Sequence, residues 1–226
     1  MTLGHGPRIV TDQLAFIVDA ANLNSYPGIG TTVYDIGPNK LSGSSTQLVY
    51  DNTNGGSFGF NGFSTRMQTF SNYLGFDTTS KTMCAWINLT SAAASSTFIS
   101  RMDTASAGWA FMVSSSFKLV FRTGSTEVAD TGSGVVPTGA WCFVCIPYDF
   151  SATTAYYYYN AVLSGSKTTT DTSAANSSVN MQIGGLNTTL AGYLTGYIAH
   201  ISLYNKALSA AEIQQNFNAH RGRFGV

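Results

Sequence analysis

Short runs of apolar or alternating residues recur along the chain, and glycine, asparagine, serine and proline separate them. Runs of this length and spacing predict an all-β fold in which two antiparallel sheets pack face to face. Strands are expected over residues 14–19, 47–50, 57–60, 66–70, 82–89, 98–101, 109–114, 118–123, 141–148, 155–160, 180–183 and 193–204.

Alternation within these runs assigns side chains to faces. Met83, Ala85, Ile87 and Leu89 share one face of their strand, because successive side chains of a strand point to opposite sides. The opposite face, like the positions of His200 and Ser202 in the last strand, is expected to be wetter. Residues 141–146 are apolar on both faces, which predicts a central strand covered on both sides.

One segment near the end of the sequence has helical signals. Ser209 followed three residues later by Glu212 matches a capping box, and Ile213 and Phe217 follow at helical spacing. A short helix of about three turns is expected, with Gly222 beyond its end. We therefore divide the chain into an N-terminal arm (1–12), one sandwich domain (13–220) and a C-terminal tail (221–226).

The balance of charge excludes some partners. Of the 226 residues, 44% are hydrophobic and only 10% are charged, and eleven lysines and arginines balance eleven acidic residues. A chain without a basic field has little attraction for phosphates, so neither nucleic acid nor an anionic membrane is an expected partner. No apolar run has the length of a signal peptide or a membrane span.

The chain has few candidate catalytic residues. Hydrolysis of glycosides usually needs two carboxylates that flank the scissile bond, and the chain has two glutamates, of which Glu212 belongs to the capping box. We expect no enzyme and no catalytic residue. An enzyme that acts on polysaccharides, with Glu127 as its acid, is the third-ranked alternative.

Histidine and cysteine positions predict neither a metal site nor a cofactor. His5, His200 and His220 are widely separated and form no local metal-binding spacing. Cys142 and Cys145 lie three residues apart in a predicted strand, which places them on opposite faces. Together with Cys84 they are expected to be buried free thiols.

Aromatic residues are the candidates for carbohydrate binding. The four tyrosines 156–159 should split two and two between the faces of their strand, with both pairs expected in the core and a sugar platform as the alternative. The candidate sugar-stacking residues are Tyr157 and three aromatic residues in or next to predicted loops, Tyr26, Tyr34 and Trp109.

Several segments together resemble the concanavalin A-like, laminin-G-type jelly roll. They cover residues 14–22, 25–35, 58–62, 84–87, 139–149, 158–161, 183–185 and, most specifically, 192–213. The resemblance implies a two-sheet jelly-roll sandwich. Many relatives carry Asp-Gly where this chain has Asn61-Gly62, with further acidic residues where Ser64 follows, which argues against the calcium site that many of them hold.

Residues 6–12 and 218–224 resemble the version of this domain found in structural proteins of tailed bacteriophages, marine ones especially. The resemblance implies a non-enzymatic virion protein, made in the host cytoplasm and assembled with other virion proteins. We expect capsid decoration, with the arm as attachment and with contact to host or environmental glycans. A tail-fibre or receptor-binding lectin for host sugars is the alternative, and a homo-oligomer is expected.

Overall fold

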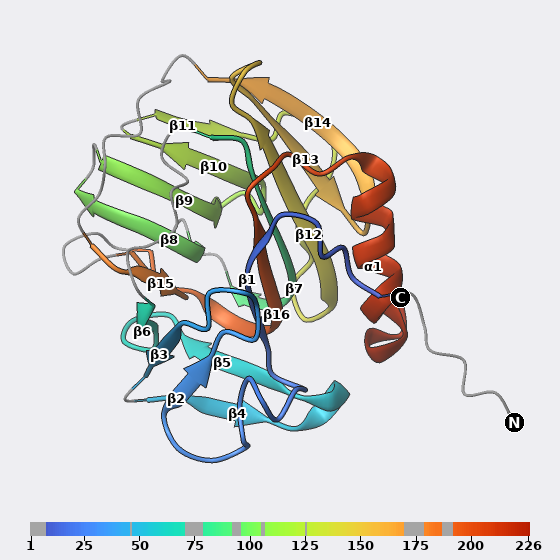
Figure 1. Ribbon diagram of the computed structural model, residues 1–226. Helices are drawn as coiled ribbons and strands as arrows, with labels where there is room; N and C mark the ends of the chain where they lie inside the picture. The colour runs from blue at the N-terminus through green and yellow to red at the C-terminus, as the bar shows by residue number, and fades with distance from the viewer. Residues whose placement is uncertain are drawn as a thin grey trace, which may run out of the picture.

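The computed structural model describes residues 8–45, 47–70, 79–91, 96–104, 107–124, 126–169, 179–186 and 192–226. Within these ranges the chain forms two eight-stranded antiparallel sheets that pack face to face, with one α-helix outside them (Figure 1). The predicted all-β, two-sheet class with a C-terminal helix is confirmed.

The first sheet has the strand order β14-β13-β12-β7-β16-β5-β4, and β1 pairs with the second half of β16. Its strands are β1 (Leu14–Asp19), β4 (Val49–Asp51), β5 (Ser57–Asn61), β7 (Lys81–Ser91), β12 (Trp141–Asp149), β13 (Thr154–Tyr159), β14 (Val162–Thr168) and β16 (Thr195–Tyr204). A 3-10 turn, η1 (Thr53–Gly55), joins β4 to β5. β12 lies between β13 and β7, so the predicted central strand is confirmed.

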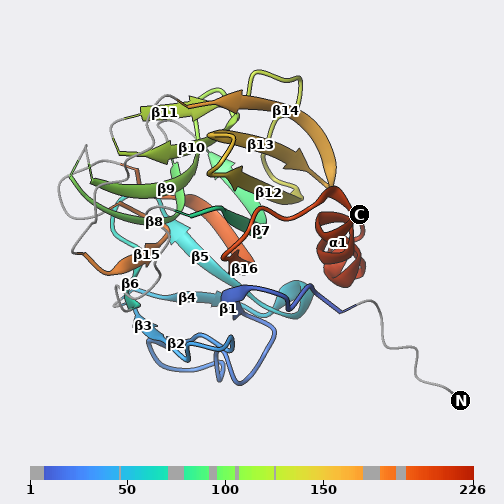
Figure 2. The ribbon, with the colours of Figure 1, turned by 45° about the horizontal axis from the view of Figure 1, so that its top comes forward.

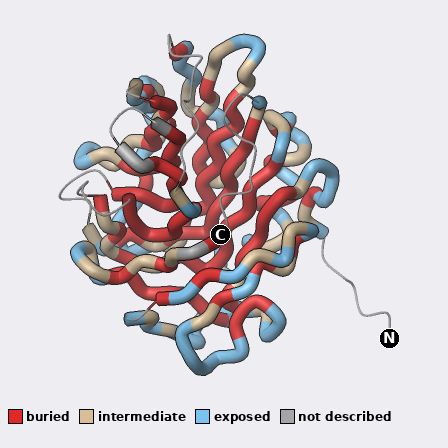
Figure 3. Tube along the Cα trace, turned by 60° about the vertical axis from the view of Figure 1, so that its left-hand side comes forward, coloured by how far each residue is buried: buried red, intermediate tan, exposed pale blue. Residues whose placement is uncertain are grey.

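The second sheet has the order β11-β10-β9-β8-β15-β6-β3-β2. Its strands are β2 (Thr32–Tyr34), β3 (Ser42–Ser44), β6 (Met67–Phe70), β8 (Ser96–Thr104), β9 (Ala107–Val113), β10 (Leu119–Thr123), β11 (Thr126–Ala129) and β15 (Met181–Ile183). Figure 3 shows that buried positions gather in the strands of the two layers and exposed positions in the connections.

The space between the sheets holds the main hydrophobic core. Met83, Ile87 and Leu89 of β7 point into it, as their alternation predicts, and meet inward side chains of the second sheet such as Phe111. Phe16 and Phe70 connect the two layers edge to face, with ring centroids 5.1 Å apart. Burial of this apolar surface is the main stabilising contribution to the sandwich.

The outer face of the first sheet is not the wet face that the alternation predicted. The helix α1 (Ala210–Phe224) lies against it beside β12 (Figure 2). Trp86 of β7 stacks on Phe217 and Phe224 of α1, with ring centroids 5.6 and 4.3 Å apart. His200 and Ser202 are also buried. A second hydrophobic cluster therefore forms outside the sheet, under the helix.

The start of α1 follows the prediction and its end does not. Ser209 accepts a hydrogen bond from the Glu212 backbone, and Glu212 accepts one from the Ser209 backbone, so the capping box is present. The helix continues through Gly222 to Phe224 and ends at Gly225, whose φ of 69° is left-handed. The stacking of Phe224 on Trp86 stabilises the last turn, and this outweighs the poor helix propensity of glycine.

Residues that precede β1 are fixed to the helix and to β16 by a ring of hydrogen bonds. The Val10 backbone N–H donates to Asn216 Oδ1 (2.8 Å), Asn216 Nδ2 donates to the Tyr204 hydroxyl (3.1 Å), and that hydroxyl donates to the Val10 carbonyl (3.1 Å). Because Asn216 and Tyr204 are both buried, each of these polar groups is satisfied within the protein.

The domain boundaries drawn from the sequence stay a prediction.

The cysteines follow the predicted division between faces. Cys142 lies in the core between the sheets, and Cys145 lies in the outer cluster, where its sulfur is 2.7 Å from that of Cys84. All three are buried free thiols, as expected. In the part of the chain that the structure describes, no helix is both long enough and apolar enough to cross a membrane.

Candidate functional site

A row of paired residues crosses the first sheet on its outer face, beyond the reach of α1. Val49 of β4 is opposite Gly59 of β5, Gly59 is opposite Tyr197 of β16, and Tyr197 is opposite Asn88 of β7. Directly opposite residues share one face of a sheet. Phe58 and Phe60 pack into the core, so Gly59 between them faces outward.

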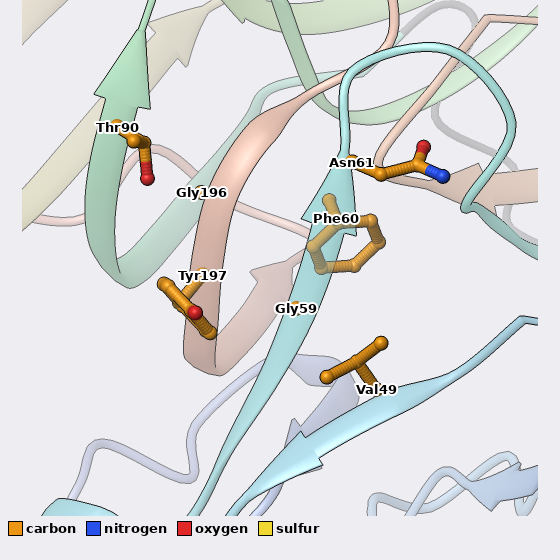
Figure 4. Close-up of a pocket in the computed structure, with 7 residues that line it drawn as sticks. All are labelled: Val49, Gly59, Phe60, Asn61, Thr90, Gly196 and Tyr197. Atoms are coloured by element: carbon orange, nitrogen blue, oxygen red, sulfur yellow. The ribbon is translucent and has the colours of Figure 1, made fainter.

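This row forms the floor of an open groove with a volume of about 210 Å³. Figure 4 shows the residues that line it, which are Val49, Gly59, Phe60, Asn61, Thr90, Gly196 and Tyr197. They belong to four neighbouring strands or their ends. A volume below the roughly 300 Å³ of the smallest drug-sized sites fits one small ring rather than an extended ligand.

Gly59 keeps the groove open. A Cβ atom at this position would lie 3.2 Å from the Val49 Cβ and 3.3 Å from the Tyr197 Cε1, so any side chain would fill the space between these two residues. Val49 is 57% exposed, and Tyr197 is half-buried. The glycine thus leaves an aliphatic and an aromatic surface facing the same hollow.

Asn61 orders the loop at the upper end of the groove. Its Oδ1 accepts hydrogen bonds from the backbone N–H groups of Phe63, Ser64 and Thr65 at 2.9 to 3.1 Å. Its Nδ2 donates to the Ser64 hydroxyl at 2.8 Å. A side chain with this many internal partners fixes the shape of the rim, because each bond holds one residue of the loop in place.

The groove offers hydroxyl groups and no charge. None of its lining residues is acidic, basic, histidine or cysteine, so they provide no side chain that could hold a metal. The hydroxyls of Thr90 and Tyr197 have no hydrogen-bond partner within the described part of the chain. A neutral ligand that combines an apolar ring face with hydroxyl groups therefore suits the groove.

Two of the aromatic residues predicted to stack on sugars are inaccessible. Trp109 is fully buried in β9, and Tyr26 is 3% exposed, packed against Tyr50 and Phe58. The Tyr26 hydroxyl donates to the Gly30 carbonyl at 3.0 Å. Both predictions are wrong for the same reason, since these rings fill the core and expose no face. Tyr34 is 46% exposed at the edge of the second sheet and stays a prediction.

Tyr157 is also a wrong prediction for a sugar platform. It is buried, its hydroxyl donates to the Val128 carbonyl at 2.6 Å, and burial raises its pKa. The tyrosine run splits two and two, as expected. Tyr157 and Tyr159 lie in the core, whereas Tyr158 and the half-buried Tyr156 belong to the outer cluster.

The two glutamates lie on different elements, and each has a cationic partner. Glu127 of β11 forms an ion pair with Arg122 at 2.8 Å, and Glu212 of α1 forms one with Lys206 at 2.6 Å. Partial burial alone would raise the pKa of Glu212, but hydrogen bonds from Lys206 and Ser209 outweigh it and lower that pKa. Neither glutamate lines the groove.

The sequence prediction missed Tyr197, Val49 and Gly59. The one signal in the sequence is the pattern Phe58-Gly59-Phe60, which places two rings on one face of a strand and nothing on the other. The contribution of Val49 and Tyr197 depends on strand register, which alternation alone does not provide.

Solved structures with the same fold share little sequence with this chain. Domain 4 of the extracellular GH43 arabinanase AbnA from Geobacillus stearothermophilus, solved in complex with arabinotriose, superposes with a TM-score of 0.69 at 14% identity, covering 92% of this chain and 100% of that domain. The receptor-binding domain of botulinum neurotoxin type G gives 0.67 at 13% identity, covering 91% of this chain and 51% of that one.

An enzyme has a similar fold as well. Trypanosoma rangeli sialidase in complex with sialic acid gives a TM-score of 0.66 at 12% identity, covering 93% of this chain and 33% of the sialidase. The chain thus spans about half of the neurotoxin domain and a third of the sialidase. At these identities the likeness establishes the fold alone.

Comparison with protein families shows which family the chain belongs to. No curated protein matches it in sequence. Residues 61–214 match the laminin G model described as the concanavalin A-like lectin/glucanases superfamily. This stretch spans more than half of the chain and includes the central strands of both sheets and the start of the helix. The chain is therefore a member of the concanavalin A-like lectin/glucanases superfamily.

Proposed function

We propose that this protein is a non-catalytic carbohydrate-binding module and that the groove around Tyr197 receives one neutral sugar ring. The observation that carries the proposal is the half-buried Tyr197 ring, which borders a hollow kept open by Gly59, with Val49 on the other side. A tyrosine ring beside a hollow can stack on the apolar face of a sugar, and free hydroxyls can bind its hydroxyl groups.

The solved neighbours support the choice of ligand class. One of them holds arabinotriose and another holds sialic acid. The uncharged lining of the groove favours a neutral sugar such as arabinose over an acidic one, because it offers no cation to pair with a carboxylate. The proposal of a non-catalytic module is supported by the pairing of both glutamates with cations outside the groove.

The test is a glycan array followed by isothermal titration with the best neutral ligand. Tyr197→Ala should weaken binding at least about tenfold, the equivalent of 1.4 kcal/mol, because it removes the stacking surface. The matched control is Tyr34→Ala, which removes an exposed tyrosine from the second sheet and should leave affinity unchanged.

Either of two results would overturn this assignment. Unchanged affinity in Tyr197→Ala would exclude the groove as the sugar site. Loss of binding in Tyr34→Ala alone would move the site to β2. Tyr34 of that strand is the one sugar-stacking residue predicted from the sequence that the structure leaves accessible. Gly59→Ala provides a further check. Its added methyl group would narrow the groove and should reduce sugar affinity, although it removes no group that contacts the ligand.

We further propose that the module acts on the surface of a phage particle. Support comes from the resemblance of residues 6–12 and 218–224 to phage structural proteins. Quantitative proteomics of purified particles, with heads and tails separated, tests this setting. Many copies on heads would indicate decoration, a few copies on tails would indicate a receptor-binding fibre, and absence from particles would contradict the proposal.

A further inference from the structure

Three side chains that are far apart in the sequence meet under the C-terminal half of α1. They are Asp19 at the end of β1, His200 in β16 and His220 in α1. The Asp19 Oδ2 lies 3.6 Å from His200 Nδ1 and 3.7 Å from His220 Nε2. Among the described residues, this is the one group in which three metal-ligating atoms all lie within 4.8 Å of one another.

Strand pairing and an irregularity in β16 build the cluster. Asp19 is directly opposite His200 in the β1–β16 ladder, and the register of β16 against β7 shifts between Ile198 and His200. Such a bulge redirects a side chain. The His200 ring lies under the helix, with its centroid 4.5 Å from that of His220.

His200 carries an unsatisfied nitrogen into this cluster. Its side chain is 3% exposed, and its Nδ1 has no hydrogen-bond partner. The other ring nitrogen, Nε2, lies 3.4 Å from the Ser202 hydroxyl. An imidazole that donates from one nitrogen to a neighbouring oxygen presents a lone pair at the other, which is the arrangement of histidines that bind metals.

The carboxylate of Asp19 presents one of its two oxygens to the histidines. Oδ1 accepts hydrogen bonds from the Ala21 backbone N–H and from Arg223 Nη1, both at 2.9 Å. Arg223 Nη1 also lies 3.3 Å from Oδ2.

We propose that Asp19 Oδ2, His200 Nδ1 and His220 Nε2 form a site for a divalent transition-metal cation, with Zn²⁺ as the best match and water as the fourth ligand. Two imidazole nitrogens and one carboxylate oxygen are a ligand set that zinc favours. Ligands about 2.0 to 2.2 Å from a tetrahedral zinc lie roughly 3.3 to 3.6 Å from each other. The two distances to Asp19, 3.6 and 3.7 Å, are close to this range, whereas the two histidine nitrogens, which lie within 4.8 Å of each other, have to move closer together on binding.

Binding at this site would connect three elements. The ion would join the end of β1, the bulge of β16 and the C-terminal half of α1, in addition to the Arg223–Asp19 ion pair that already links the helix to β1. The site is independent of the groove, because none of its residues lines it. It does not depend on whether the groove binds sugar.

The experiment uses the full chain after treatment with EDTA, titrated with ZnCl₂ by calorimetry and followed by thermal unfolding. We expect one equivalent of Zn²⁺ per chain and a higher unfolding temperature, since an ion that binds only the folded state stabilises it. His220→Ala should reduce affinity at least about tenfold. If this variant unfolds, His220→Gln replaces it with the same expected loss.

Two controls separate this site from other ligands. His5→Ala removes the third histidine of the chain and should leave zinc affinity unchanged. Co²⁺ in place of Zn²⁺ should give a visible spectrum without the near-ultraviolet band of a cobalt–thiolate bond. The proposal is overturned by absence of zinc binding, by unchanged affinity in the His220 variant, or by a thiolate band, which would assign the metal to the cysteines.

Discussion

The outer face of the first sheet has two halves that share strands but differ in what lies over them. In the covered half, which includes Trp86, Phe143 and Tyr204, large side chains of β7, β12 and β16 pack under α1. In the open half, defined by the lining of the groove, the same β7 and β16 present Thr90 and Tyr197. The comparison shows that alternation assigns a face, whereas the neighbouring element decides whether that face becomes core or groove.

The largest effect should come from removing the helix contact in the covered half. Phe217 is 6% exposed and stacks on Trp86, so Phe217→Ala should lower the free energy of unfolding by about 3–5 kcal/mol. Denaturation in urea measures it. The matched control is Phe63→Ala in the loop beside the groove, where a 74% exposed ring should contribute within about 0.5 kcal/mol. Similar losses in both variants would contradict the distinction between the halves.

A smaller effect is expected in the open half, where a side chain rather than a helix provides order. Asn61→Ala removes the acceptor of three backbone N–H groups, two of which are exposed and can bond to water instead, and should cost about 0.5–1.5 kcal/mol. It should also weaken sugar binding, because Asn61 forms the rim of the groove. Asn61→Asp keeps the accepting oxygen and should retain most of the stability. If both variants were equally destabilised, the three bonds would not be the cause.

The smallest effect concerns the start of α1 and depends on pH. The folded-state pKa of Glu212 is lowered, so the contribution of its carboxylate to stability is fully present above its ordinary pKa of 4.5 and is lost as the pH falls through the lowered value. Glu212→Gln should cost a few tenths to about 1 kcal/mol at pH 7. At low pH, where Glu212 of the parent protein is protonated and neutral, the free energies of unfolding of the Glu212→Gln variant and of the parent protein should become similar. A constant difference between pH 7 and pH 3 would exclude the carboxylate charge as the cause.

Most of the fold could be predicted from the pattern of apolar residues. Every strand expected from the sequence overlaps a strand of the structure, and the twelve predicted runs miss β2, β3, β11 and β14. Three of these missed strands lie at sheet edges, where one side of the strand is unpaired and the apolar pattern is weak. The strand β14, for example, has no buried residue.

The candidate sites were harder to predict, since they depend on register and on contacts between distant segments. Trp109 and Tyr157 were favoured for their residue type, but an aromatic ring in a sandwich fills the core unless a gap is left for it on the surface. The histidines were set aside because their spacing is wide. The pairing of Asp19 with His200 in the β1–β16 ladder and the packing of α1 on the outer face of the sheet bring them together.

The hydrogen-bonded ring of Val10, Asn216 and Tyr204 has a mechanical consequence. A pulling force on the residues that precede Val10 reaches the sandwich through Asn216 and Tyr204 before it loads the β1–β16 ladder. These hydrogen bonds divide the force between α1 and β16. A load on this end of the chain must therefore break them before it separates β1 from β16.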